Sequence, residues 1–304
     1  MAQSDDDFTP RRYQVRHKTT YRYDDAVEAA YERGFLRHRD TPQQRVVENT
    51  ITISPDADVV ADHLDHFGNH SFYVEVRSPH TELVVESVGL IDVDWPRPDL
   101  LALNGWTVAS AAAAVAGDAG IDPVERATFL LPSPLIDLAP SVARYAEGPL
   151  GADRPLGEAL AALVHAIYTD FKYQPGSTSV RTTLPELLRQ RRGVCQDFAH
   201  LAVGCLRSAG IPARYVSGHI ETTPPAGRPR LEGSDASHAW ASALTPLGWV
   251  DLDPTNDHFA DSRYLTRAWG RDFRDVSPLK GVVFTEAKKS TLKVGVDVLR
   301  MPSA

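Results

Sequence analysis

The sequence is short of three things: cysteine, long apolar runs and positive charge. Its 304 residues include only two cysteines, and 32 lysines and arginines against 40 acidic residues give a formal net charge of −8. This balance argues against nucleic acid or an anionic membrane as the main partner. No apolar run approaches the roughly 18 residues that a membrane-spanning helix needs. The first seven residues are polar and acidic, unlike a secretory signal, so we expect a cytoplasmic protein that binds neither nucleic acid nor a membrane.

The two cysteines lie in one predicted helix and are not expected to form a disulfide. Cys195 and Cys205 would be separated by roughly 15 Å along the helix axis, which is beyond the reach of a disulfide. Neither belongs to a CxxC pair, so the usual spacing of a cysteine zinc site is missing. Cys205 falls on the apolar face of the helix and is interpreted as a small buried hydrophobe. Cys195 lies outside that face.

The length of the chain favours two domains rather than a single core. Segments rich in β-branched and aromatic residues are separated by short turns in the first third of the sequence, which predicts an antiparallel, sandwich-like N-terminal domain. A proline-rich break at 94–98 marks its end. We divide the chain into a disordered lead, a β-rich N-terminal domain, a helical connecting segment and a catalytic domain: 1–10, 11–95, 96–154 and 155–304.

Three histidines near a predicted turn at 65–70 raise the question of a metal site. His63, His66 and His70 are accompanied by acidic residues, but a glycine-asparagine pair between them is typical of a hairpin. The helical spacing that would bring the histidines together conflicts with this turn. We therefore expect a solvated hairpin here, and no metal or other cofactor in the protein.

The most informative stretch, at 191–201, is a glycine turn that leads into a helix. Apolar residues from Phe198 to Ala209 follow helical spacing, and Gly210 is a typical stop signal. Cys195 therefore lies in the first turn, where four backbone N–H groups lack partners and the helix dipole is positive. This setting favours the thiolate, which is the nucleophilic form of the side chain. The sequence thus predicts a cysteine nucleophile that needs a base.

A predicted hairpin further along the chain supplies a histidine and an aspartate. If Leu244 pairs with Trp249 across its turn, His238 and Asp253 become diagonal neighbours on one face, with their backbones roughly 7–8 Å apart. A slip of one residue would place the two side chains on opposite faces. Because a cysteine nucleophile needs a histidine and a third group that orients it, we expect a Cys–His–Asp triad.

Three motifs around these residues resemble the core motifs of the transglutaminase-like superfamily: GVCQDFA, SHAW and WVDLDPT. Their order is that of the family. The resemblance implies Cys195 as the nucleophile, His238 as the acid/base and Asp253 as its orienting group. It also implies an α+β, papain-like catalytic domain in which the cysteine helix packs on an antiparallel sheet. The first 95 residues are similar to the β-rich region that precedes this domain in many bacterial members.

Acyl transfer also needs a group that stabilises the oxyanion. The backbone N–H of Cys195 is one candidate. The hydroxyl of Tyr173 is another, because bacterial members of the family often carry a tyrosine upstream of the cysteine; a packing role for this residue stays open. Asp197 is interpreted as a charge that complements the helix dipole rather than as a second catalytic carboxylate. His200 is interpreted as a structural histidine, and His219 is left as a residue that could line the cleft.

The resemblance implies a cofactor-independent enzyme that forms a thioester acyl-enzyme. We favour a peptidase or amidase that acts on a peptide or protein substrate, since no calcium-site carboxylate clusters or glutamine-donor pocket are recognisable. Protein-glutamine amine transfer, as in cross-linking transglutaminases, is one alternative, and a non-catalytic peptide-binding or scaffolding member is another. Arylamine acetyltransferases share the triad, but their doubled glycine and glutamate are missing around Cys195. The segment 222–235 is hypothesised to be a lid, and the oligomeric state is left open.

Overall fold

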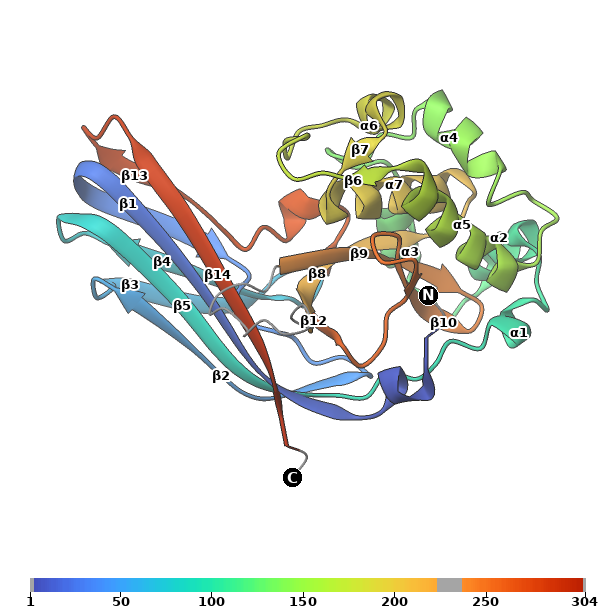
Figure 1. The fold of residues 1–304 in the computed structure, drawn as a ribbon, viewed down its shortest axis with the longest axis horizontal. Coiled ribbons are helices and arrows are strands. Elements are labelled where there is room, and N and C mark those ends of the chain that lie inside the picture. The colour runs from blue at the N-terminus through green and yellow to red at the C-terminus, as the bar shows by residue number, and fades with distance from the viewer. Residues whose placement is uncertain (1–2, 223–236, 303–304) are drawn as a thin grey trace, which may run out of the picture.

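The computed structural model describes residues 3–222 and 237–302, and it has the expected α+β fold (Figure 1). A curled seven-stranded sheet lies beside a five-stranded sheet, and helices cover the face of the smaller sheet that is turned away from the larger one. Both sheets are antiparallel. The candidate site lies in the smaller sheet and its helices.

The larger sheet is built around β1 (Arg11–Gly34), which pairs with other strands on both sides along its length. Its first half pairs with β5 (His80–Val93) on one side and β14 (Ser290–Met301) on the other. Its second half pairs with β4 (His70–Val76) and β13 (Leu279–Thr285). The register shifts between the two halves, where β1 bends. One curved strand thus joins the N-terminal segment of the chain to its C-terminal segment.

Two further strands, β2 (Gln44–Ser54) and β3 (Val59–Leu64), pair with β5 and β4 and complete the sheet. All seven strands belong to one curled sheet, whereas the sequence suggested a sandwich-like arrangement. The sequence analysis also placed 279–301 within the catalytic domain, 155–304. These residues instead pair with β1, because β1 would otherwise expose one row of unpaired backbone groups. The larger sheet is therefore assembled from both ends of the chain.

The smaller sheet contains the predicted hairpin at its centre. Its strand order is β11–β10–β9–β8–β12. The strands are β8 (Ala213–Ile220), β9 (Ser237–Thr245), β10 (Gly248–Asp253), β11 (His258–Phe259) and β12 (Tyr264–Gly270).

Helices pack on one face of the smaller sheet, with α7 lying against β8 and β9. The apolar residues of α7 that the sequence pattern picks out are buried, including Phe198 and Leu201. Residues of the connecting segment join the same core: Val108 and Val142 are buried in it. The helices are α1 (Leu100–Leu103), α2 (Val108–Gly117), α3 (Pro123–Leu130), α4 (Pro140–Glu147), α5 (Leu156–Asp170), α6 (Leu184–Gln190) and α7 (Cys195–Ser208).

Two side-chain amides of the N-terminal sheet domain cap the open edge of β12. Gln44 accepts a hydrogen bond from the Thr266 N–H (2.8 Å) and donates one to the Thr266 carbonyl (2.7 Å). Asn69 does the same with Trp269, at 3.0 and 2.8 Å. The turn that precedes Asn69 is held by the Asp65 carboxylate, which accepts the Asn69 N–H. The turn for which a metal was considered thus docks the two sheets together.

Residues 3–10, expected to be a disordered lead, lie against the smaller sheet. A 3-10 helix, η1 (Asp5–Phe8), follows Gln3, whose amide donates to the Phe259 carbonyl (2.9 Å) and to Asp261 (2.6 Å). The Asp7 carbonyl accepts the Ser262 N–H. These polar contacts order a segment that has little apolar surface of its own.

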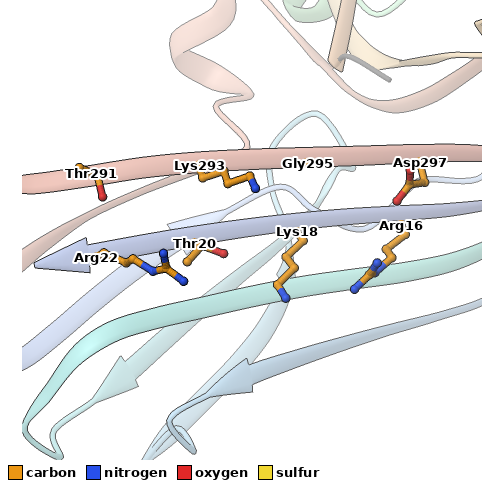
Figure 2. A pocket seen from close by; sticks show the side chains of 8 residues that line it. All are labelled: Arg16, Lys18, Thr20, Arg22, Thr291, Lys293, Gly295 and Asp297. Atoms are coloured by element: carbon orange, nitrogen blue, oxygen red, sulfur yellow. The ribbon is translucent and has the colours of Figure 1, made fainter. Parts of the chain in front are cut away.

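The outer face of the larger sheet carries a groove of about 510 Å³ between β1 and β14 (Figure 2). Two of its cations are paired with carboxylates of β5, Arg16 with Glu86 and Arg22 with Glu82. The residues that line it are Arg16, Lys18, Thr20, Arg22, Thr291, Lys293, Gly295 and Asp297. None of the predicted triad residues is among them.

Among the described residues, no helix is both long enough and apolar enough to cross a bilayer.

Candidate active site

Cys195 is the first residue of α7, as the sequence predicts. A left-handed residue, Arg191 (φ 53°), ends α6 and turns the chain. The short strand β7 (Arg192–Gly193) then pairs in parallel with β6 (Lys172–Tyr173) and leads directly into the helix. The Cys195 side chain is partly exposed, and it packs beside the cluster that contains Phe35 of the N-terminal domain.

The first turn of α7 is held by Asp197. Its carboxylate accepts the Val194 N–H (2.8 Å) and the Thr178 hydroxyl (2.7 Å). A Cβ at Gly193 would lie 2.8 Å from an oxygen of this carboxylate, so only glycine fits at that position. Burial raises the pKa of Asp197, and the two hydrogen bonds oppose the shift. These contacts place the Asp197 carboxylate at the start of α7, where it is interpreted as a charge that complements the helix dipole.

The hairpin of β9 and β10 has the predicted register, with Leu244 opposite Trp249. His238 and Asp253 share a face, and His238 Nε2 lies 2.7 Å from Asp253 Oδ2. Both side chains are buried, at 8% and 0% exposure. The Cys195 thiol lies near the same imidazole and favours its charged form. Since Nε2 is engaged by Asp253, the other ring nitrogen, Nδ1, is left for the thiol.

This arrangement favours a charged imidazole. Burial by itself disfavours the charge on His238, but the Asp253 carboxylate, its hydrogen bond to the imidazole and the nearby Cys195 outweigh it and raise the pKa of His238 to about 10. For Asp253, burial opposes ionisation, but His238 and further hydrogen bonds hold its pKa below the usual range. The pair is therefore an imidazolium and a carboxylate at neutral pH.

Two residues that the sequence analysis missed complete the surroundings of Asp253. Tyr264 donates its hydroxyl to Oδ2 at 2.5 Å, and Asn256 donates its amide to the same oxygen at 2.7 Å. The other oxygen, Oδ1, accepts the Thr255 N–H at 2.8 Å. Asn256 follows the WVDLDPT motif directly and could have been considered as a polar neighbour. Tyr264 lies on a separate strand, β12, and carries no local signal of this role.

Aromatic rings enclose the histidine. Trp240 stacks on His238 with ring centres 6.2 Å apart and an interplanar angle of 26°. Trp240 is fully buried and donates its indole N–H to Asp251 at 2.8 Å. Its ring also meets that of Tyr264 edge-on. Such walls limit the access of water to the His238–Asp253 pair and so strengthen its electrostatic interaction.

Tyr173 lies in β6, which pairs with the residues just before Cys195. Its side chain is half exposed and its ring lies 6.4 Å from that of Phe198. Burial and the nearby Cys195 raise the pKa of Tyr173, so its hydroxyl keeps its proton and can act as a donor. Its role as an oxyanion donor stays a prediction.

The other two histidines considered from the sequence, His200 and His219, are buried and hydrogen-bonded within the fold. His200 is buried and its Nε2 accepts the backbone N–H of Phe273, which begins the short 3-10 helix η2 (Phe273–Asp275). His219 is completely buried, away from solvent, and bonds to two other histidines. Within 3–222 and 237–302, no group of three or more histidine, cysteine or acidic residues is arranged to hold a metal ion. Of the hypothesised lid, 223–235 lie outside the described residues.

Comparison with known proteins places this geometry in a family. The family model described as "Bacterial transglutaminase-like N-terminal region" matches residues 13–92, and that described as "Transglutaminase-like superfamily" matches residues 143–254. An uncharacterised protein of Mycobacterium tuberculosis is 43% identical over 297 residues, which is 95% of this chain and 92% of that protein. The chain belongs to the transglutaminase-like superfamily. The resemblance inferred from the three sequence motifs is thus confirmed.

Two further likenesses bear on this transglutaminase-like protein. A Pseudomonas aeruginosa protein named protein-glutamine gamma-glutamyltransferase is 33% identical over 103 residues, which is 31% of this chain and 15% of that protein. The crystal structure of a Cytophaga hutchinsonii protein, described as a candidate cysteine protease, superposes with a TM-score of 0.76. That match covers 97% of this chain and 92% of the other at 18% identity, so it shows the fold. The fold shared with that protein therefore includes both sheets.

Proposed function

We propose that this transglutaminase-like protein catalyses cysteine-dependent acyl transfer, with water as the acceptor and an amide or peptide bond as the substrate. The observation that carries the proposal is the grouping of three side chains. Cys195 stands at a helix N-terminus, its thiol lies near His238 and favours the charge of the imidazole, and His238 Nε2 lies 2.7 Å from Asp253. This is the geometry that a thiol nucleophile, an acid/base and its orienting group require.

In the proposed mechanism, the Cys195 sulfur attacks the carbonyl carbon of the substrate and a tetrahedral oxyanion forms. The protonated His238 then gives its proton to the leaving amine as the C–N bond breaks, and a thioester remains on Cys195. Neutral His238 next takes a proton from water, whose oxygen attacks the thioester carbonyl. The carboxylic acid leaves, and the sulfur and imidazole return to their starting state. Asp253 keeps the imidazole oriented and stabilises its charge throughout.

The oxyanion would be stabilised by two donors. The Cys195 backbone N–H lies in the first turn of α7, where backbone donors have no intrahelical acceptor. The Tyr173 hydroxyl is the second donor that we propose. If it acts on the oxyanion, Tyr173→Phe lowers kcat by about a hundredfold and leaves KM nearly unchanged. An equal loss through KM alone would assign Tyr173 to substrate binding.

Amine transfer is the second candidate, and one observation favours it. The Pseudomonas aeruginosa relative that bears the name protein-glutamine gamma-glutamyltransferase is 33% identical to this chain over 103 residues. The first chemical step is the same for both candidates, and they differ in whether water or an amine attacks the thioester. The preference for water rests on the sequence, in which no glutamine-donor pocket is recognisable.

The first test measures whether the thiol and imidazole form a reactive pair. Cys205 is fully buried and burial raises its pKa, so Cys205→Ala provides a background with one thiol. We expect iodoacetamide to alkylate Cys195 rapidly at about pH 6, well below the pKa near 8.5 of a free thiol. His238→Ala should abolish this reactivity at unchanged circular dichroism. If Cys195 instead reacts like a free thiol, the non-catalytic binding role takes first place.

The second test separates the two reactions. Wild type and Cys195→Ala are incubated with dimethylcasein and a fluorescent primary amine, and the products are examined by mass spectrometry. Hydrolysis gives new peptide termini or glutamate in place of glutamine. Amine transfer gives fluorescent casein instead. Fluorescent casein as the main product, formed by wild type only, would replace hydrolysis with transfer as the function.

A further inference from the structure

An arginine is turned into the interior between the two sheets by a β-bulge. The register of β12 against β8 shifts between Thr266 and Ala268, so Arg267 is the additional residue of the bulge. Bulges of this kind re-aim a side chain. Arg267 is 0% exposed, and its guanidinium donates to the Ser217 hydroxyl at 2.5 Å. Within 3–222 and 237–302, its Nε and Nη1 atoms have no hydrogen-bond partner.

Other buried arginines of the protein are compensated. Arg11 forms an ion pair with Glu221 at 2.9 Å. Arg207 donates to several backbone carbonyls and has Asp272 nearby. Arg214 has Asp251 nearby and stacks on the Trp249 and Trp269 rings. Each of these three buried charges thus has a carboxylate, a backbone carbonyl or an aromatic ring beside it.

Arg267 differs in this respect. Burial lowers the pKa of Arg267 to about 10, so it still carries its charge at neutral pH, and Tyr215 is the group that favours the charge. No carboxylate in the described part of the chain acts on it. A buried cation without a counter-charge is strongly unfavourable. The interior of the protein therefore contains one positive charge that its described side chains leave unbalanced.

Three buried histidines, whose charged forms Arg267 disfavours, form a hydrogen-bonded chain. His219 of β8 bonds through Nε2 to His17 Nδ1 (3.2 Å) and through Nδ1 to His38 Nε2 (3.0 Å). Burial, together with Arg267, lowers the pKa of all three, to about 3 for His17 and His38. The three histidines of this hydrogen-bonded chain are therefore neutral at neutral pH. Because each neutral ring donates once, one end of the chain always presents an N–H, at His17 Nε2 or His38 Nδ1.

Neither end atom of the chain has a partner among the described residues. The buried seam between the sheets thus contains a full positive charge, two guanidinium nitrogens whose N–H groups are unused, and one unused imidazole N–H. They come from both parts of the molecule: His17 and His38 from the N-terminal part, and His219 and Arg267 from the smaller sheet. An acceptor with one negative charge would satisfy this set.

We propose that Arg267 and the adjacent His17–His219–His38 chain bind a small inorganic anion, chloride, in the buried seam between the two sheets. Complete burial of Arg267 favours a monatomic anion over a substrate or a larger oxyanion. The anion neutralises Arg267 and accepts N–H groups from both parts of the molecule. It therefore holds the N-terminal sheet against the smaller sheet, and it is independent of the acyl-transfer chemistry proposed for Cys195.

Thermal unfolding tests the proposal without reference to activity. We expect the unfolding temperature of the wild-type protein to be about 2–4 °C higher in sodium chloride than in sodium gluconate at equal concentration, because only the smaller anion fits. Arg267→Met should abolish this difference. Ser217→Asp should also abolish it, because a carboxylate beside the guanidinium replaces the anion. Equal unfolding temperatures of the wild-type protein in the two salts would overturn the proposal.

Arg11→Met is the matched control. It removes a buried arginine at the edge of the same seam, but one that is paired with Glu221. This variant can be less stable overall, yet it should keep the difference between chloride and gluconate. If this variant loses the difference in unfolding temperature, the salt effect comes from general electrostatics, and the proposed anion site is overturned.

Crystals of the wild-type protein grown in sodium bromide provide the direct observation. An anomalous bromide peak in contact with the Arg267 guanidinium supports the site. Water at that position, without anomalous signal, overturns it, because hydrogen bonds to water would then be sufficient for the guanidinium.

Discussion

Two buried histidine sites lie next to each other on paired strands of the smaller sheet, and they have opposite charge states. His238 of β9 stands beside a carboxylate, which raises its pKa to about 10 despite burial. His219 of the adjacent strand β8 is linked to other histidines and lies near Arg267, and its pKa falls well below the usual value. Gly218 is the direct partner of His238 across the two strands. A difference of one position along β8 thus separates a charged histidine from a neutral one.

The comparison shows that burial does not decide the charge of a histidine. Burial acts in the same direction at both sites, against the imidazolium. What differs is the partner: Asp253 at one site, and neutral rings with a guanidinium at the other. In the candidate active site and in the seam, the neighbouring group therefore decides the charge of the buried histidine. Replacing that group should change the charge at either site.

The largest effect is expected from removing the carboxylate that distinguishes the two sites. Asp253→Asn should convert His238 into a neutral histidine and lower kcat/KM by about 10⁴-fold, because the imidazolium and its orientation are both lost. Activity against a peptide or ester substrate and the NMR titration of His238 measure the two consequences. Asp251→Asn is the control, since this second buried aspartate of β10 bonds to Trp240 and Ser242 and should cost less than tenfold. Full activity of Asp253→Asn would contradict the proposed role.

A smaller effect is expected when the carboxylate stays and loses one donor. Tyr264→Phe removes the hydroxyl from Asp253, which makes the carboxylate a stronger base and raises the pKa of His238 further. We expect kcat to fall tenfold to a hundredfold, the cost of a hydrogen bond to a charged group, and the alkaline limb of the pH profile to move to higher pH.

Tyr13→Phe is the matched control for Tyr264→Phe. Tyr13 is also fully buried in the same apolar cluster, but its hydroxyl donates to Glu221 at 2.6 Å. This variant should lose similar stability and keep the pH profile of the wild type. If both variants shift the profile alike, Tyr264 acts through packing and not through Asp253.

The smallest effect is expected at the neutral site, in the dependence of stability on pH. The pKa of His17 is about 3 in the folded protein and near 6.5 when unfolded. Below about pH 6.5 the unfolded chain binds a proton that the folded protein does not, so stability falls as the pH falls. His17→Gln should remove up to about 2 kcal/mol of the loss in unfolding free energy between pH 7 and 5. Urea unfolding at both pH values measures it.

The exposed His63 gives the reference for that experiment. His63 lies on β3 with an exposed side chain, so His63→Gln should leave the loss between the two pH values as it is in the wild type. A change of similar size in both variants would show that His17 is not specially buried in solution.

The sequence predicts the candidate site better than the residues around it, because the features that indicate the site depend on residues close together in the chain. The start of α7 at Cys195 and the pairing of Leu244 with Trp249 depend on neighbouring residues: a glycine turn, apolar periodicity and a short hairpin. These local features were sufficient to place His238 and Asp253 on one face. Tyr264 reaches Asp253 from another strand, and no spacing in the sequence encodes that approach.

The sequence also does not show which strands pair when they lie far apart in the chain. The sequence predicts strands around 280–284 and 291–299 but does not say which sheet they join, and both pair with β1 rather than with the smaller sheet. The role of His219 is a similar case. It was considered only as a possible cleft residue, since its partners His17 and His38 lie far away in the chain and share no motif with it.

The pairing of β1 with β13 and β14 has a consequence for how the protein is made. During synthesis β1 leaves the ribosome long before the strands that cover one of its edges. Contacts between such distant segments form slowly, and an uncovered strand edge can pair with other chains in the meantime. The nascent chain therefore carries an open edge from the synthesis of β1 until that of β14, and its yield in a cell depends on what shields that edge until then.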